Sequence, residues 1–311
     1  MKKAHRFGKI VLMGPPNAGK STLVNALVGQ KISIVTDKPQ TTRNQIIGIC
    51  SEPGAQIVFM DTPGLHYDKT QMRGPLAKMM IQSAWQSLTA ADAVLLVLDG
   101  GLYVRRPEYM GRDVAAFHDA LAGEERPVFI VFNKVDLFHD KAKMLPVLQE
   151  LQGLFPKAEI FPMSAFNKDG LAELKAMLVA AMPEGEAEFP EDQLSTAPMR
   201  FLASEIIREK LFEHLRQEVP YSTAVDIEAW EDDPDGEHTL IHAVIYVARQ
   251  SHKAIVIGHA GAGIKEIGTA ARKDIEALTG TRVNLRLWVK VKENWIDEIK
   301  TFNNFDAEEF M

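Results

Sequence analysis

The segment 14–21 reads Gly-Pro-Pro-Asn-Ala-Gly-Lys-Ser, follows the apolar run 10–13 and precedes a helical pattern. It matches G-x-x-x-x-G-K-[ST] in the strand–loop–helix setting in which this motif holds phosphates. Glycine at both ends lets the backbone curl and turn its N–H groups toward phosphate oxygens. Lys20 is placed to reach the β- and γ-phosphates, and the Ser21 hydroxyl to bind Mg²⁺. The motif predicts a nucleoside triphosphate site and leaves the base and the reaction open.

The size and composition of the chain indicate two ordinary globular domains. Its 311 residues are many for one compact domain, and 46% hydrophobic with 25% charged residues is typical of globular proteins. Cys50 is the only cysteine, which excludes an internal disulfide and suits a reducing compartment. No apolar stretch approaches the roughly eighteen residues of a membrane span, and no signal sequence follows the basic start. We therefore expect a cytoplasmic protein.

Residues 1–183 alternate short apolar runs with helical patterns, which predicts a doubly wound α/β sheet. The expected strands are 9–13, 46–50, 56–60, 93–98, 128–132 and 159–161. The expected helices are 21–29, 71–88, 107–122, 141–154 and 171–182. Only the second and third strands lie close enough for a hairpin, so one edge strand should be antiparallel and the sheet mixed.

A second domain is expected after a linker. Residues 184–198 are rich in Glu, Pro, Ser and Thr without periodicity, which predicts a linker. Residues 199–311 then follow a different order, with a C-terminal extension at the end. The expected elements are a helix over 199–218, strands over 223–230 and 239–247, a short helix over 253–257, a glycine-rich loop, a helix ending near 278 and a strand over 282–290.

Two further motifs follow expected strands, at the edge where open α/β sheets bind ligands. In 61–64, Asp-Thr-Pro-Gly, the Asp61 carboxylate can hold Mg²⁺ through water, and the Gly64 N–H can meet the γ-phosphate. In 133–136, Asn-Lys-Val-Asp, the Asp136 carboxylate can accept hydrogen bonds from N1–H and the 2-amino group of guanine, a donor pair that adenine lacks. The second motif therefore selects GTP over ATP.

The remaining predicted contacts complete a guanine-nucleotide site. Asn133 should tie its loop to the phosphate loop, the stem of Lys134 should cover the base, and Ser164-Ala165 should bring a backbone N–H near the guanine O6. The predicted nucleotide-binding residues are Gly14, Pro15, Pro16, Asn17, Ala18, Gly19, Lys20, Ser21, Thr22, Asp61, Thr62, Pro63, Gly64, Leu65, Asn133, Lys134, Val135, Asp136, Ser164 and Ala165.

This ordered set resembles the translation-factor-type GTPases over about the first 180 residues. The resemblance implies two switch segments, near 31–45 and 61–78, and a threonine of the first as a further Mg²⁺ ligand. The candidates are Thr41 and Thr42, and Thr42 fits better because it precedes an arginine. The implied Mg²⁺ ligands are Ser21, Thr42 and Asp61, and the implied catalytic residues are Lys20, Asn17, Thr42 and Gly64.

Two positions depart from, or add to, the common GTPase pattern. Leu65 stands where Ras-like GTPases carry the glutamine that orients the attacking water, so intrinsic hydrolysis should be slow. Related GTPases with asparagine at the position of Asn17 bind K⁺, which takes over the role of the arginine finger. The alternative is that the Asn17 side-chain amide only stabilises the phosphate loop and binds no cation. Equal hydrolysis in K⁺ and Na⁺ would exclude the K⁺ role.

In the second domain, Gly258-His259-Ala260-Gly261 resembles the GxxG loop of KH domains, which holds the backbone of about four unpaired nucleotides. The expected element order is that of a type-2 KH fold. Residues 249–292 hold nine Lys or Arg against three Asp or Glu, in a chain of net charge −7. The predicted RNA-binding residues are Lys253, Gly258, His259, Ala260, Gly261, Lys265, Arg272 and Lys273. Trp288 and Trp295 are expected to pack in the core or under the terminal helix.

Together with segments 201–210 and 219–222, nearly the whole chain resembles the Era family, the KH-domain GTPases of the TrmE-Era-EngA-like class. The resemblance implies that the GTP-loaded protein binds small-subunit ribosomal RNA near its 3′ end, assists small-subunit assembly and associates with the inner face of the cell membrane. DNA is not an implied partner. Family members carry lysine where this chain has Ala260 and Gly263. Weaker RNA binding with a shallower salt dependence is therefore expected.

Three other functions are compatible with parts of the chain. The same GTPase domain could serve a transfer RNA or a protein partner. A phosphotransferase would use the same phosphate loop, but the guanine motif and the lack of a recognisable acceptor-binding segment argue against it. An RNA-binding module with an inactive nucleotide site is the third, and the intact Lys20, Ser21 and Asp61 argue against that. We therefore expect a slow GTPase coupled to RNA binding.

Overall fold

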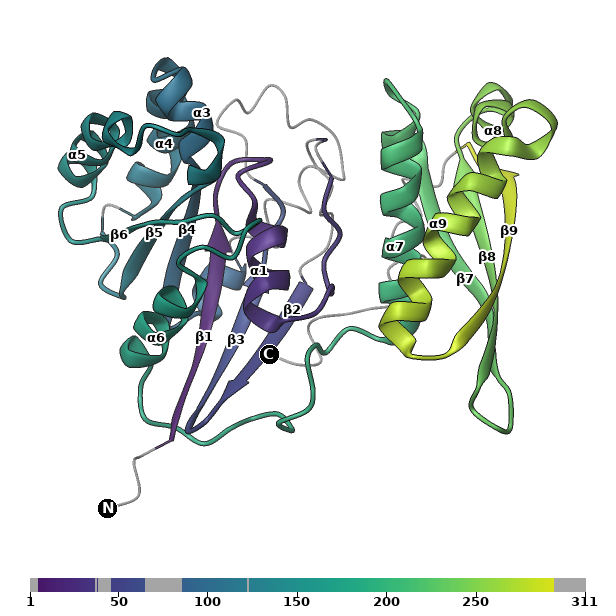
Figure 1. The fold of residues 1–311 in the computed structure, drawn as a ribbon, viewed down its shortest axis with the longest axis horizontal. Coiled ribbons are helices and arrows are strands. Elements are labelled where there is room, and N and C mark those ends of the chain that lie inside the picture. Colours follow the sequence, from purple (N-terminus) through teal and green to yellow (C-terminus); the bar gives the residue numbers. More distant parts are fainter. Residues whose placement is uncertain (1–4, 37, 39–45, 65–85, 122, 294–311) are drawn as a thin grey trace. The chain divides into compact units, whose positions relative to one another are not determined.

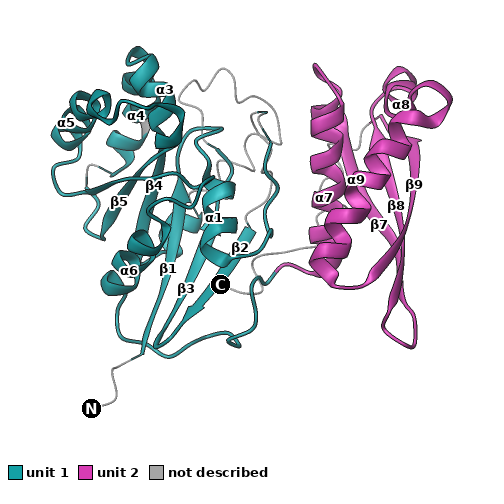
Figure 2. Cartoon of the chain, viewed as in Figure 1, with its two compact units in different colours: residues 1–196 teal, residues 197–311 magenta. Residues whose placement is uncertain are grey.

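The computed structural model describes residues 5–36, 38, 46–64, 86–121 and 123–293, and these form two compact units, 1–196 and 197–311 (Figure 2). Thr41, Thr42, Leu65 and Trp295 lie outside the described residues, as does most of the expected helix 71–88. In the described part, no helix is long and apolar enough to cross a membrane. The expected location of the protein stays a prediction.

The first unit is built on a six-stranded mixed sheet in the order β2-β3-β1-β4-β5-β6 (Figure 1). Its strands are β1 (Arg6–Met13), β2 (Ile46–Glu52), β3 (Ala55–Asp61), β4 (Ala93–Asp99), β5 (Val128–Asn133) and β6 (Glu159–Pro162). Strands β2 and β3 form an antiparallel hairpin, and every other pairing in this sheet is parallel. The predicted doubly wound mixed sheet with one antiparallel edge strand is confirmed.

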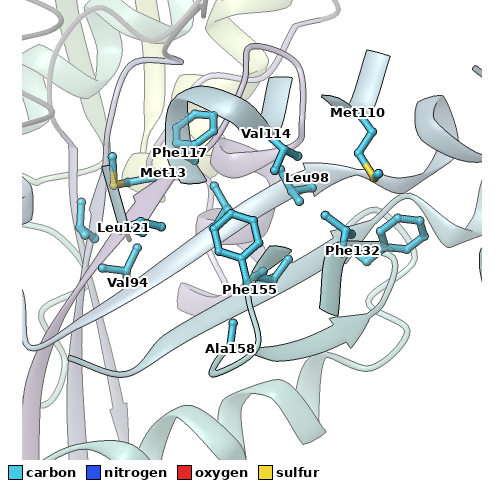
Figure 3. Close-up of a cluster of buried hydrophobic side chains, with 14 of the residues drawn as sticks. Met13, Val94, Leu98, Met110, Val114, Phe117, Leu121, Phe132, Phe155 and Ala158 are labelled. Atoms are coloured by element: carbon cyan, nitrogen blue, oxygen red, sulfur yellow. The ribbon is translucent and has the colours of Figure 1, made fainter. Parts of the chain in front are cut away.

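Helices cover both faces of this sheet. They are α1 (Lys20–Val28), α3 (Gly100–Arg105), α4 (Glu108–Leu121), α5 (Leu145–Leu154) and α6 (Leu171–Ala181). On α4, the buried residues Met110, Val114, Phe117 and Leu121 recur every three or four positions and so share one side of the helix. They pack with Leu151 of α5 against alternate residues of the central strands (Figure 3). Helices α1 and α6 contact each other on the opposite face (Figure 1).

Residues 184–196, which the sequence assigns to a linker, belong to the first unit. Their last residues, Leu194 and Ser195, bond to β2, an edge strand that would otherwise expose unpaired backbone groups, whereas Gly185, Glu188 and Phe189 bond to His5 and to Gln56 of β3. The Ile49 N–H donates to Leu194 O at 2.9 Å, and the Ser195 hydroxyl donates to Ile47 O at 2.6 Å. The expected linker is therefore a strap on the sheet edge. Its polar, proline-containing sequence resembles a linker because these backbone and hydroxyl bonds need no apolar period.

In its described residues, 197–293, the second unit combines a three-stranded sheet with three α-helices. Its elements are α7 (Met199–His214), β7 (Thr223–Asp232), β8 (His238–Val247), α8 (Gln250–Ile257), α9 (Ala262–Thr279) and β9 (Arg282–Val291). The sheet order is β7-β8-β9, with β7 and β8 antiparallel and β8 and β9 parallel. The predicted order of elements is confirmed. The first helix ends at His214, before the expected residue 218.

One face of this sheet is covered by helices and carries the core. The buried α9 residues Ile267, Ala271 and Ile275 lie four apart and pack on the sheet. On β9, Val283 and Val289 face this core, and alternation places Trp288 on the other side of the strand. Trp288 is 43% exposed, with its ring edge-on to His242 at a centroid distance of 5.0 Å. Of the two places expected for Trp288, the core is thereby excluded, and the residues of the expected terminal helix lie outside the described part of the chain.

Candidate nucleotide site and RNA-binding loop

The predicted nucleotide motifs meet at the carboxyl edge of the first sheet. In the strand register Leu12 of β1 lies opposite Asp61 of β3, and Asp99 of β4 lies opposite Asn133 of β5. Because these strands are parallel, the loops that follow them emerge side by side. The phosphate loop, the 61–64 motif and the 133–136 motif are thereby brought to one edge.

Lys20 lies buried at the start of α1, just after the phosphate loop. Its ammonium donates to Gly14 O and to Pro15 O, each at 3.0 Å, and its side chain is 6% exposed. Burial lowers the pKa of Lys20 to about 8, although the carboxylate of Asp61 favours the charged form. A phosphate arriving in the loop would restore the lost solvation of this ammonium. Thr22 follows in the first turn of α1.

The Asp61 carboxylate lies fully buried at the end of β3. Its Oδ2 accepts hydrogen bonds from the hydroxyls of Ser21, at 2.7 Å, and Ser33, at 2.8 Å. Its Oδ1 is buried and has no hydrogen-bond partner in the described part of the chain. Burial raises the pKa of Asp61, and the Ser21 hydroxyl and the Lys20 ammonium oppose that rise. A buried, unpartnered carboxylate oxygen beside a hydroxyl fits a Mg²⁺ ion with its water shell.

The 61–64 motif packs directly against the phosphate loop. A Cβ placed on Gly64 would lie 2.8 Å from the Cα of Pro16, so only glycine allows this approach. The Thr62 hydroxyl donates to Leu12 O at 2.6 Å, which anchors the motif to β1. The buried Pro63 lies between these two residues. The backbone of residue 64 thus lies beside the loop that holds the phosphates.

Asn133 joins three loops of the site. Its Nδ2 donates to Ala18 O at 2.8 Å, and its Oδ1 accepts from the Ala165 N–H at 2.9 Å. Gly19 allows this contact, because a Cβ there would lie 2.3 Å from Asn133 Nδ2. The structure therefore contains the predicted tie between the 133–136 motif and the phosphate loop. Since the Ala165 N–H serves Asn133, its expected contact with the guanine O6 stays a prediction.

Lys134 and Asn17 lie together at the mouth of the loop. Both adopt left-handed backbone conformations, with φ of 66° and 61°. The Lys134 ammonium donates to Asn17 O and to the Asp99 carboxylate, the latter at 2.7 Å. This places the stem of Lys134 across the space between the two motifs. Asn17 itself is exposed.

The Asp136 carboxylate is held by Ser164. The Ser164 hydroxyl donates to Asp136 Oδ1 at 2.6 Å and accepts from the Asn167 N–H at 3.1 Å. Because the Asn167 N–H supplies one bond, the hydroxyl proton is directed to Asp136. Val135 is anchored through its N–H to Met163 O at 3.2 Å. One carboxylate oxygen of Asp136 is thus fixed, which sets the direction of the other.

The sequence does not identify three residues that contact this site. Ser33 donates to Asp61, Asn25 binds the backbone of Ser33, and Asp99 binds Lys134. Asp99 ends strand β4 at the ligand-binding edge of the sheet, and that position could have identified it. Ser33 and Asn25 carry no local motif. Their roles depend on how the chain returns after α1.

In the second unit, the predicted GxxG loop joins α8 to α9. Gly258 has a φ of 71°, and a Cβ there would lie 2.8 Å from the Gly263 nitrogen. Ala260 also adopts a left-handed conformation, with a φ of 49°. Gly261 is the N-cap residue just before α9, and no side chain caps the first turn of that helix. The loop therefore presents backbone N–H groups at a helix N-terminus, where anions bind.

The predicted basic residues lie on both sides of this loop. Lys253 is half-buried on α8, whereas Lys265, Arg272 and Lys273 are exposed on α9, and His259 and Ala260 are exposed in the loop. Lys265 and Lys273 line a cavity of about 560 Å³ together with Lys210 of α7. Lys210 binds Asp274 at 3.0 Å, so its charge is partly neutralised. The basic side chains of Lys265, Arg272 and Lys273 are exposed to solvent on α9.

Comparison with known proteins agrees with both units. Residues 9–134 match the family described as "50S ribosome-binding GTPase", and residues 218–296 match the KH domain family. The GTPase Era of Desulfovibrio desulfuricans is 60% identical over 294 residues, which covers 94% of each chain.

Two solved structures match the chain over nearly its whole length. Era of Aquifex aeolicus bound to GDP and AlF4⁻ is 36% identical, with a TM-score of 0.82, over 96% of this chain and 98% of that one. An Era structure in complex with MgGDPNP and nucleotides 1506–1542 of 16S ribosomal RNA is 36% identical, with a TM-score of 0.83 and the same coverage. From the motifs, the fold and these similarities, the chain belongs to the Era family of GTPases.

Proposed function

We propose that this GTPase is a GTP-dependent switch whose KH unit binds small-subunit ribosomal RNA near its 3′ end and assists assembly of the small ribosomal subunit. The observation that supports this most is the presence in one chain of a guanine-nucleotide edge and a GxxG loop. A 36% identical Era has been solved with MgGDPNP and a 16S ribosomal RNA segment on a matching fold.

In this proposal the nucleotide is held from three sides. The Lys20 ammonium, now on the carbonyls of Gly14 and Pro15, moves to the β- and γ-phosphates. Asp136 accepts the guanine N1–H and 2-amino hydrogens, and the Gly64 N–H meets the γ-phosphate. Bound Mg²⁺ neutralises charge on the phosphate oxygens. The Ser21 hydroxyl and the Asp61 carboxylate hold that ion, with Thr42 as the proposed switch ligand.

Hydrolysis should depend on K⁺, because Leu65 offers no hydrogen bond to the attacking water. The exposed Asn17 lies at the mouth of the phosphate loop, where its amide oxygen can bind a monovalent cation. We expect GTP hydrolysis to be about tenfold faster or more in K⁺ than in Na⁺ at equal ionic strength, about 1.4 kcal/mol in the barrier. The ratio should fall toward one in Asn17→Ala. Phosphate release measured in both salts tests this, and equal wild-type rates would contradict it.

The RNA partner is tested by the binding of labelled single-stranded RNA. A segment equivalent to nucleotides 1506–1542 of 16S ribosomal RNA, an unrelated single strand and a transfer RNA are compared with a GTP analogue or GDP present. We expect the ribosomal segment to bind best, and more tightly with the GTP analogue. No RNA preference and no nucleotide effect would contradict the proposal. Preference for transfer RNA would favour the alternative partner.

A pair of variants at Ala260 assigns this binding to the GxxG loop. Ala260 is exposed, so a longer side chain of either charge can point to solvent there. Ala260→Lys should tighten RNA binding and steepen the slope of log K against log salt by about 0.7 for one added phosphate contact. Ala260→Asp should weaken binding. If the two variants shift RNA affinity in the same direction, the loop does not contact the RNA backbone.

A further inference from the structure

Ser33 is buried beside the nucleotide site, although none of the nucleotide motifs includes it. It lies in the loop after α1, at the start of the expected first switch segment 31–45, and is 1% exposed. Its hydroxyl donates to Asp61 Oδ2 at 2.8 Å. The Ser21 hydroxyl donates to the same oxygen at 2.7 Å. Two hydroxyls from different parts of the chain thus bind one oxygen of the metal-site carboxylate.

The position of Ser33 is fixed by Asn25 of α1. The Asn25 Oδ1 accepts from the N–H groups of Ile32 and Ser33, each at 2.9 Å. The Asn25 Nδ2 donates to Ser33 O at 2.7 Å. Both backbone polar groups of Ser33 are therefore bound to a helix side chain. These bonds to Asn25 fix the backbone of Ser33 in a position from which its hydroxyl reaches the Asp61 carboxylate.

The two donors make the oxygens of Asp61 inequivalent. Oδ2 receives two hydrogen bonds, whereas Oδ1 is buried without a partner in the part of the chain that the structure describes. A carboxylate held in this way cannot turn without breaking a bond to Ser33 or Ser21.

We propose that Ser33 is a positioning residue of the Mg²⁺ site. Its hydroxyl holds the Asp61 carboxylate so that Oδ1 faces the ion and its water shell. It also ties the metal site to the loop that leads into the first switch segment. Partners that orient metal-binding groups in this way typically contribute tenfold to hundredfold to metal affinity. The inference rests on the proposed GTP–Mg²⁺ function.

The experiment measures release of a fluorescent GDP analogue as free Mg²⁺ is varied, without any hydrolysis. Mg²⁺ should slow release from the wild type, and Ser33→Ala should need roughly tenfold more Mg²⁺ for half of that effect. Release in excess chelator should be the same for both proteins. Ser33→Cys keeps the size and a weak donor, so its Mg²⁺ midpoint should fall between the two.

Two further variants sharpen the assignment. Asn25→Ala should raise the Mg²⁺ midpoint in the same direction, and adding Ser33→Ala should raise it no further, because both act through one hydroxyl. Ser204→Ala is the matched control. It also removes a part-buried serine hydroxyl, which donates to Phe201 O at 2.8 Å within α7 of the second unit and not in the unit that holds the metal site. Its Mg²⁺ midpoint should equal that of the wild type.

The outcomes separate this inference from the proposed function. An unchanged Mg²⁺ midpoint in Ser33→Ala overturns the inference, and so does faster release by the same factor with and without Mg²⁺, which indicates a structural role only. If wild-type release does not respond to Mg²⁺, the proposed GTP–Mg²⁺ function fails instead.

Discussion

Replacing Asp136 by Asn is expected to move the base preference of the protein from guanine to xanthine. The Ser164 hydroxyl can donate to the amide oxygen as it does to Asp136 Oδ1, at 2.6 Å, so the amide NH₂ takes the place of Oδ2. That group repels the two guanine donors but donates to the 2-oxo group of xanthine. Losing two charged hydrogen bonds of about 1.5–3 kcal/mol each weakens GTP roughly 100- to 10,000-fold.

Equilibrium binding of GDP and XDP to both proteins measures this exchange. Ser164→Ala provides the control, because it leaves the carboxylate in place but removes the donor that orients it. This variant should bind both nucleotides more weakly than wild type and still prefer GDP. If Asp136→Asn retained its selectivity for guanine, Asp136 would not be the residue that reads the base.

Replacing Lys20 by Met is expected to abolish tight GTP binding and to stabilise the nucleotide-free protein. Charged contacts with two phosphates are lost, at about 1.5–3 kcal/mol each. In the free protein the buried ammonium is destabilising, since burial lowers its pKa from 10.5 to about 8. That shift corresponds to about 3 kcal/mol at neutral pH. After the lost bonds to two carbonyls are allowed for, Lys20→Met should be more stable by about 1–3 kcal/mol.

The pH dependence of this difference identifies its cause. Between the folded pKa of about 8 and the unfolded value of 10.5, the unfolded state binds more protons at Lys20 than the folded state. The contribution of Lys20 to stability therefore rises with pH across that window. The gain in unfolding free energy of Lys20→Met over the wild type should be largest below pH 8 and should decrease as the pH rises toward 10.5. Urea unfolding without nucleotide measures it, and an advantage that does not change with pH would contradict the pKa argument.

The nucleotide edge could be predicted from sequence because each of its motifs is local. An apolar strand places the following loop at the carboxyl edge, whatever the rest of the chain does. Gly14, Asp61 and Asn133 were located in this way from short segments alone. The bond from Ser33 to Asp61 depends instead on where the chain travels after α1. No pattern within a few residues encodes that return.

The strap and Trp288 show two other limits of sequence reasoning. Residues 184–196 bond to the sheet through a few backbone groups and the Ser195 hydroxyl, which need no apolar period, so their composition indicates a linker. For Trp288 the sequence leaves two places open, the core and a position under the terminal helix. The period of two along β9 places it outside, since Val283 and Val289 face the core. Strand alternation thus decides against the core, which the local sequence around Trp288 does not.

The strap, residues 184–196, also connects β2 directly to the residues that precede the second unit. Strand β2 begins directly after the expected first switch segment, and the second unit begins at Ala197. Ile47 and Ser195 are 148 positions apart in sequence but are joined by one hydrogen bond. A displacement at the start of β2 would therefore pull directly on Leu194 and Ser195, just before the second unit, without passing through the body of the sheet.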